Sequence, residues 1–186
     1  TAIGSDVAHL KPGEAVLAIA HESLASHVLA DARLVVHKPE PLSFVDAATL
    51  PIVFVTACDG LHHLAQLQSG ERVLIHAATG GVGLAAIQLA RRAGAEVFAT
   101  AGSPEKRDYL RALGIQHVYD SRSVAFAEQI LADTGGRGVD VILNSLTGAA
   151  IPAGLSVLAP YGRFVEIGKR DVYDNTRLGL WPFQKS

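Results

Sequence analysis

Cysteine is almost absent from this chain, and neither sign of charge is in clear excess. The single cysteine, Cys58, excludes a disulfide within the 186 residues and any zinc site built from several cysteines. Sixteen Lys and Arg against 18 Asp and Glu leave a formal net charge of −2, which argues against a nucleic-acid partner. A hydrophobic content of 49% with 18% charged residues excludes a disordered chain. One cysteine fits a reducing compartment, so we expect a cytoplasmic globular protein.

The sequence also lacks a recognisable targeting or membrane-spanning pattern. Residues 1–10 have no basic stretch followed by an apolar one, so they do not resemble a signal peptide. The two longest uncharged stretches, Val73–Ala90 and Val141–Gly162, are interrupted by glycines and polar residues. Such stretches are typical of strand–turn–helix units buried in protein, and we expect no membrane partner.

Patterns for metal binding and for hydrolysis are missing as well. Among the eight histidines only His62 and His63 are adjacent, and neighbours on a helix point about 100 degrees apart. No HExxH motif is present, so we predict no metal site. Cys58 lies in an apolar helical pattern, which favours a buried thiol. Ser145 is not part of a G-x-S-x-G turn, so hydrolase chemistry has no support.

The first part of the chain carries short apolar stretches separated by turns. Ala15–Ala20 and Arg33–His37 are the candidate strands, and they are too few to bury a core of their own. Residues 1–45 are therefore either an N-terminal subdomain or the end of a larger domain. Ser43 can cap a helix that follows it, and apolar residues at helical spacing continue to Leu67.

From residue 70 onward, strand and helix patterns alternate regularly. Ser103-Pro104 marks the start of one helix and Gly94 the end of another. The alternation predicts an α/β fold with a doubly wound, parallel Rossmann-type sheet covered on both faces. The predicted strands are Arg72–Ala77, Glu96–Thr100, Gln116–Tyr119, Val139–Leu143 and Gly162–Ile167, and the predicted helices are Gly83–Arg92, Pro104–Gly114, Val124–Ala132 and Ala149–Leu158.

A glycine-rich segment between the first of these strands and the first helix is the strongest local motif. It is typical of a loop that binds the diphosphate of a dinucleotide, because glycines allow close backbone approach and the helix N-terminus offers free N–H groups. Ala78 replaces the first glycine of the usual pattern, and a glycine-rich turn without a ligand is the alternative. The predicted phosphate-binding residues are Thr79, Gly80, Gly81, Val82 and Gly83.

The end of the second predicted strand indicates which nicotinamide cofactor binds. NAD sites place an Asp or Glu there to accept the ribose hydroxyls, whereas residues 99–103 contain no carboxylate. Ser103, Lys106, Arg107 and Arg122 lie near this point in the predicted fold, and cations suit a 2′-phosphate. We therefore predict NADPH, with the alternative that Lys106 and Arg107 are ordinary solvated helix residues.

Several segments together resemble one particular family. They are Leu50–Ala57 (LPIVFVTA), Gly70–Ala90 (GERVLIHAATGGVGLAAIQLA), Gly135–Leu146 (GGRGVDVILNSL) and Gly162–Lys169 (GRFVEIGK). This combination is similar to the enoylreductase domain of type I polyketide synthases and animal-type fatty acid synthases. That domain belongs to the medium-chain dehydrogenase/reductase superfamily.

The resemblance implies NADPH-dependent reduction of a 2-enoyl thioester held on an acyl carrier protein, beside neighbouring synthase domains. It implies that Lys169 is the catalytic residue, stabilising an enolate or donating a proton. It also places Asn144, Ser145 and Leu146 along the ribose and nicotinamide, with Ile167 and Gly168 as the far wall. Leu146 can instead be a core residue.

The same resemblance implies a domain division. Residues 1–45 are expected to be the remnant of a β-rich substrate domain, 46–69 a linker helix, and 70–186 an NADPH-binding Rossmann domain truncated at its C-terminus. Two other functions stay open: a free-standing quinone or enone oxidoreductase of the same superfamily, and a non-catalytic NADPH-binding module. The oligomeric state also stays open, a homodimer included.

Overall fold

The computed structural model describes residues 2–185, which fall into two compact units that divide between Val55 and Thr56. The division lies inside the predicted linker of residues 46–69. The helical residues of that region run from α1 (Phe44–Ala48) through α2 (Leu50–Cys58) to η2 (Asp59–Leu64). Helix therefore begins two residues before the predicted linker and ends five residues before its end.

The unit before the division contains little regular structure. Strand β1 (Val16–Ala18) pairs antiparallel with β2 (Val35–His37), which follows the short helix η1 (Ala32–Leu34). Both strands lie inside the stretches predicted for them. Ser43 caps α1 as predicted, since its side chain accepts a hydrogen bond from the Asp46 N–H. Few side chains of this unit are buried.

The helical run Phe44–Leu64 has the length and hydropathy of a membrane span, with a mean hydropathy of 1.5. It is the one such run in the described part of the chain. Length and composition are weak evidence, because core helices of water-soluble proteins share both properties. Asp46, Asp59 and the His62-His63 pair also interrupt its apolar character. The prediction of no membrane partner stays a prediction.

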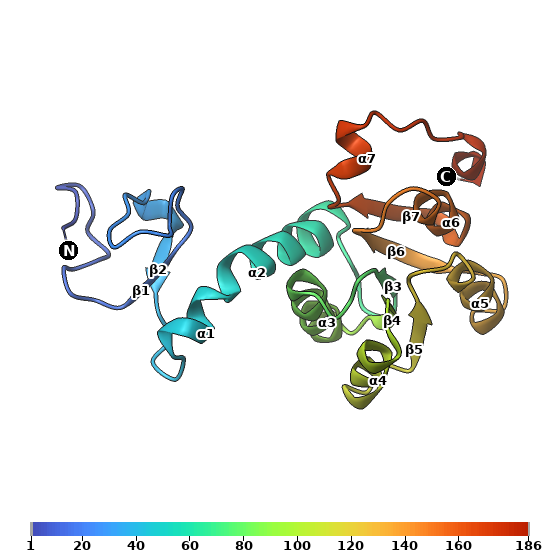
Figure 1. The fold of residues 1–186 in the computed structure, drawn as a ribbon, viewed down its shortest axis with the longest axis horizontal. Coiled ribbons are helices and arrows are strands. Elements are labelled where there is room, and N and C mark those ends of the chain that lie inside the picture. Colours follow the sequence, from blue (N-terminus) through green and yellow to red (C-terminus); the bar gives the residue numbers. More distant parts are fainter. Residues whose placement is uncertain (1, 186) are drawn as a thin grey trace. The chain divides into compact units, whose positions relative to one another are not determined.

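The second unit is built on a five-stranded parallel sheet, as predicted (Figure 1). Its strand order is β5-β4-β3-β6-β7, so the chain starts in the middle, moves to one edge, and returns to build the other. The strands are β3 (Arg72–Ile75), β4 (Glu96–Ala101), β5 (His117–Asp120), β6 (Val139–Asn144) and β7 (Leu158–Glu166), and the connecting helices are α3 (Gly81–Ala93), α4 (Pro104–Ala112), α5 (Phe126–Asp133) and α6 (Ala150–Ser156). The short helices α7 (Arg170–Tyr173) and η3 (Trp181–Lys185) follow the sheet.

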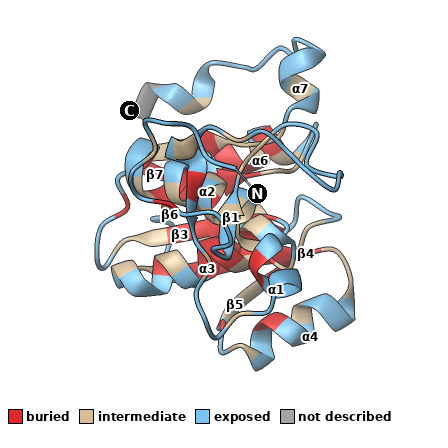
Figure 2. Ribbon diagram, turned by 90° about the vertical axis from the view of Figure 1, so that its left-hand side faces the viewer, coloured by how far each residue is buried: buried red, intermediate tan, exposed pale blue. Residues whose placement is uncertain are grey.

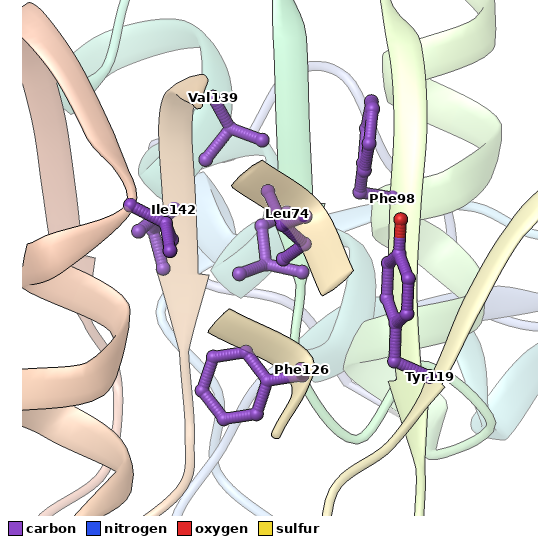
Figure 3. Packing of buried hydrophobic residues seen from close by; sticks show 8 residues of the cluster. Leu74, Phe98, Tyr119, Phe126, Val139 and Ile142 are labelled. Atoms are coloured by element: carbon purple, nitrogen blue, oxygen red, sulfur yellow. The ribbon is translucent and has the colours of Figure 1, made fainter. Parts of the chain in front are cut away.

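Helices cover both faces of this sheet, with α3 and α4 on one face and α5 and α6 on the other (Figure 1). Residues of the inner strands are almost entirely buried (Figure 2). Between the sheet and helices α5 and α6 lies an apolar cluster (Figure 3). Its buried members are Leu74, Phe98, Tyr119, Phe126, Ile130, Val139, Ile142 and Val157.

Most of the predicted boundaries of this unit are wrong by one or two residues, and the start of the last strand is wrong by four. The helix predicted to start at Gly83 starts at Gly81, because Gly80 adopts the extended N-cap conformation (φ −74°, ψ 167°). The strand predicted to start at Gly162 starts at Leu158, which pairs with Val139 across a register shift. Tyr161, at φ +60°, lets the strand bend there and continue.

Parallel strands bring their carboxyl ends to one edge of the sheet. Strands β3, β4, β6 and β7 end there at Ile75, Ala101, Asn144 and Glu166. Open α/β sheets bind ligands outside this edge, at the point where the strand order reverses. In this sheet the reversal lies between β3 and β6, directly beside the glycine-rich loop.

Candidate functional site

The loop from β3 to α3 leaves the first turn of α3 without a side-chain cap. Gly80 is the N-cap, it makes no side-chain cap hydrogen bond, and the first turn contains no acidic residue. The N–H groups of a first helical turn have no partner within the helix, and the helix dipole is positive there. Thr79, Gly80, Gly81 and Val82 are exposed or half-buried. The loop can therefore hold an anionic group such as a diphosphate.

Gly83 has a different role from the exposed glycines. It is buried, and a Cβ at this position would lie 2.6 Å from backbone atoms of Ala78. The start of α3 therefore packs directly on the loop backbone, which only glycine permits. This contact sets the angle at which the helix N-terminus leaves the loop.

Hydrogen bonds from β4 hold the start of this loop. The Ala78 N–H donates to the carbonyl of Thr100 at 2.9 Å, and His76 Nδ1 lies 2.9 Å from Thr100 Oγ1. Ala77, between them, has φ +48°, a left-handed conformation that costs energy in a non-glycine residue. Thr100 thus stabilises a strained turn through its hydrogen bonds, a role that the glycine-rich motif alone did not reveal.

His76 is held in its neutral form. Burial lowers its pKa to about 4 from 6.5, because the surrounding apolar groups solvate an imidazolium poorly. Its ring meets Phe126 edge to face at 5.0 Å. Among the described residues, Nε2 has no hydrogen-bond partner. A charged ring at this position would destabilise the base of the loop.

The carboxyl end of β4 lies close to cationic side chains, and residues 99–103 include no carboxylate. The Arg122 side chain lies across Gly102, since a Cβ there would be 3.1 Å from Arg122 Nε. Ser103 caps α4 as predicted, accepting from the Lys106 N–H, and Lys106 is exposed. Arg107 is already paired: its guanidinium donates to the Ala101 carbonyl at 3.2 Å and forms an ion pair with the Asp120 carboxylate at 3.2 Å. Arg122 and Lys106 are thus the more available cations.

Besides Asp120, a second acidic residue near this point was not singled out in the sequence. Glu105 is exposed, and a hydrogen bond with the Ser103 side chain lowers its pKa. Its own backbone N–H and the charges of Arg107 and Arg122 act in the same direction. Its carboxylate therefore shares the surroundings of the predicted 2′-phosphate site, and would oppose a second anion there.

The ends of β6 and β7 meet at the predicted nicotinamide region. Asn144 and Glu166 lie opposite each other in register, and the Ile167 N–H donates to the Asn144 carbonyl at 2.9 Å. Asn144 is fully buried, whereas Ser145 and Leu146 are half-buried. Ser145 Oγ is 3.5 Å from the His76 carbonyl, which brings this turn next to the glycine-rich loop.

Lys169 follows β7 by three residues and is the N-cap of α7. Its side chain is exposed, and it directly follows the half-buried Gly168. Asp171 of α7 accepts from the Gly148 N–H at 3.2 Å and from the Thr176 hydroxyl at 3.0 Å. These bonds tie the segment that carries Lys169 to the segment after β6. The predicted site residues thus lie along one edge of the sheet.

A search with protein-family models matches residues 81–183, more than half of the chain, to the family described as zinc-binding dehydrogenase. The chain belongs to this family. The fold predicted from the alternating pattern agrees with this membership. Despite the family's description, the described residues contain no group of three His, Cys, Asp or Glu side chains that could hold a metal ion. The described side chains therefore do not fit a bound zinc ion.

Polyketide synthases are among the similar proteins of this dehydrogenase chain. It is 54% identical to the phthioceranic/hydroxyphthioceranic acid synthase of Mycobacterium tuberculosis, over 100% of the chain and 9% of that protein. Among solved structures it is 51% identical to the CurK enoyl reductase, with a TM-score of 0.82, over 90% of this chain and 51% of that one. The predicted resemblance to synthase enoylreductases is confirmed.

A third similarity is to a nucleotide-binding subdomain. The nucleotide-binding subdomain of the PpsC enoylreductase domain from Mycobacterium tuberculosis is 53% identical, with a TM-score of 0.70. The match covers 73% of this chain and 75% of that one. The family implies a nicotinamide cofactor, and the uncapped first turn of α3 in the dehydrogenase chain fits its diphosphate.

Proposed function

We propose that this chain is the cofactor-binding part of an enoyl reductase that uses NADPH. The observation that carries the proposal is its 51% identity and 0.82 TM-score to an enoyl reductase, over 90% of its length. The substrate is then a 2-enoyl thioester on an acyl carrier protein, in the cytoplasm and beside other synthase domains. The chain spans 8–9% of the length of the curated polyketide synthases that it matches, which supports a multidomain setting.

The choice of NADPH over NADH rests on charge at the end of β4. Residues 99–103 offer no carboxylate to ribose hydroxyls, and Arg122 lies across Gly102. Lys106 stands one helical turn into α4, whose N-terminus faces the same point. A dianionic 2′-phosphate gains from both cations and from the helix N-terminus, whereas an unmodified ribose does not.

The chain's own residues supply binding and charge stabilisation. When bound, the cofactor supplies a hydride to the β-carbon of the enoyl thioester. The glycine-rich loop holds its diphosphate, and the segments after β6 and β7 flank its other end. Negative charge then develops on the thioester oxygen. The Lys169 ammonium either stabilises the resulting enolate or donates the proton that the α-carbon receives.

Two measurements test this proposal. Titration of the 186-residue chain with NADPH and NADH should show tighter binding of NADPH, and equal or tighter binding of NADH would contradict the cofactor assignment. In the protein that carries this chain, a crotonyl thioester on an acyl carrier protein should oxidise NADPH. Turnover of a quinone but not of the thioester would favour the quinone reductase alternative. Cofactor binding without either turnover would favour a non-catalytic module.

A further inference from the structure

The carboxylate of Glu166 joins the ends of two neighbouring strands. Its Oε2 accepts a hydrogen bond from Asn144 Nδ2 at 2.6 Å, and its Oε1 accepts one from the Gly168 N–H at 2.5 Å. Glu166 is the last residue of β7, and Asn144 is the last residue of β6. One side chain therefore connects the turn that leaves β6 with the turn that leaves β7.

The orientation of the Asn144 amide depends on this carboxylate. Asn144 is completely buried; Nδ2 also donates to the Leu146 carbonyl at 2.9 Å, and Oδ1 accepts from the Leu146 N–H at 3.2 Å. Turning the amide over would place donor against donor and acceptor against acceptor. Without Glu166, one buried N–H of Asn144 would lose its acceptor, at a cost that folding usually avoids.

The second hydrogen bond acts on the Ile167–Gly168 peptide, which lies one residue before Lys169. A Cβ at Gly168 would lie 2.7 Å from Glu166 Oε1, so the carboxylate packs against the Gly168 backbone. Lys169 is the next residue and begins α7. A fixed Gly168 amide therefore fixes the backbone from which the Lys169 side chain extends.

We propose that Glu166 is a positioning residue for the reduction. It holds the Asn144–Leu146 turn and the Ile167–Gly168 peptide, which precedes Lys169, in one fixed relation. The cofactor's hydride, the substrate and the Lys169 ammonium are then kept in one relative geometry. Glu166 itself transfers no proton and acts through Asn144 and Lys169. This inference rests on the proposed function. A displacement of about 1 Å in a reacting geometry can cost about 100-fold in rate, which sets the scale of the effect.

The test uses Glu166→Gln in the protein that carries this chain. The amide keeps the size of the side chain but presents an NH2 group to either Asn144 Nδ2 or Gly168 N–H, so one hydrogen bond is lost. We expect kcat for the enoyl thioester to fall about 10- to 100-fold, while the KM for NADPH changes less than about threefold. A kcat within twofold of the unmodified protein would overturn the proposal.

Glu71→Gln is the matched control. Glu71 is also a half-buried carboxylate with hydrogen bonds on both oxygens, from Arg163, but it precedes β3 at the opposite edge of the sheet. We expect this variant to lose stability and keep its kcat. An equal fall of kcat in both variants would show that the Glu166 effect is only structural, and would reject the positioning role.

A second readout does not depend on turnover. In the free 186-residue chain, amide hydrogen exchange at Gly168 and Leu146 should become at least about tenfold faster in Glu166→Ala and stay unchanged in Glu71→Gln. Unchanged exchange in Glu166→Ala would overturn the proposal. If the unmodified protein does not reduce the thioester, the proposed function fails, whereas the exchange measurement still decides whether Glu166 holds the two turns.

Discussion

His76 and Thr100 join the ends of β3 and β4 underneath the glycine-rich loop, with 2.9 Å between Nδ1 and Oγ1. The same Thr100 receives the Ala78 N–H on its carbonyl, so a side chain and a backbone group of one residue hold two successive parts of the loop. The imidazole is buried and neutral, with a pKa of about 4. The stability of the glycine-rich loop therefore depends on the charge state of a group that titrates in mildly acidic solution when the chain is unfolded.

The first prediction follows from this pKa. Between pH 6.5 and pH 4, the unfolded His76 binds a proton that the folded protein excludes, so the free energy of unfolding falls as pH falls. The expected loss from this residue is about 3 kcal/mol over that range. Chemical denaturation at several pH values should show that the free energy of unfolding falls less steeply with pH in His76→Asn than in the unmodified protein. The exposed His21→Asn serves as the control and should keep the original slope.

Gly83→Ala should distort the glycine-rich loop. The new methyl group would lie 2.6 Å from the Ala78 backbone, which cannot move away while Thr100 holds it. We expect a loss of about 1–3 kcal/mol in the free energy of unfolding, and NADPH affinity reduced by at least about tenfold. Gly179→Ala, where a methyl group meets open space, should change neither quantity. Normal NADPH binding by Gly83→Ala in calorimetry would contradict the assignment of this loop.

Charge at the end of β4 should control cofactor choice. Arg122→Ala should weaken NADPH binding by about tenfold and leave NADH binding nearly unchanged, because only NADPH carries a 2′-phosphate. Glu105→Gln should strengthen NADPH binding about twofold by removing an opposing charge, an effect that added salt reduces. Arg92→Ala, an exposed cation of α3, is the control. A similar loss of affinity for NADPH and NADH in Arg122→Ala would show that this arginine does not bind the 2′-phosphate.

Lys169→Ala should slow reduction of the thioester in the protein that carries the chain. Loss of one charge-stabilising group typically lowers kcat by about 100- to 1,000-fold, while cofactor binding persists. Arg170→Ala removes the neighbouring exposed cation, whose contact with Asp174 is 3.9 Å, and should keep most of the activity. Kinetics with a crotonyl thioester separate the two variants. Full turnover in Lys169→Ala would remove this lysine from the mechanism.

Arg163 is expected to matter for stability rather than for binding. Its guanidinium donates to both oxygens of Glu71, at 2.8 and 2.7 Å, and to the Ala65 carbonyl at 2.8 Å. These half-buried bonds connect β7 with the segment before β3. Arg163→Lys cannot reproduce the paired geometry, so we expect a loss of about 1–2 kcal/mol in urea denaturation, with NADPH affinity unchanged. An unchanged denaturation midpoint would show that the paired bonds add no stability.

Local chemistry made much of the fold predictable. The alternation of apolar strands with capped helices indicated the five parallel strands, and Ser43 and Ser103 cap helices where their positions suggested. Gly94 ends α3 at φ +78°, as expected for a glycine at that place. These features involve residues within a few positions of each other, which is why the sequence pattern was sufficient.

Boundaries that depend on pairing with a distant strand were not predictable in this way. Leu158 looked like the end of a helix, but its backbone pairs with Val139, and the irregular register that allows this forms only when β6 and β7 meet. Arg107 looked as available as Lys106, yet Asp120 at the end of the adjacent strand turns it away.

The glycine-rich loop, the missing carboxylate after β4 and the family resemblance could all be read along the chain, because backbone freedom, charge and helix capping are local properties. The orientation of each side chain at the sheet edge could not. The Glu166 carboxylate meets Asn144 from 22 positions away, and His76 meets Thr100 from 24. Such partners are chosen by the order and register of the strands, since residues distant in sequence become neighbours only after the sheet has formed.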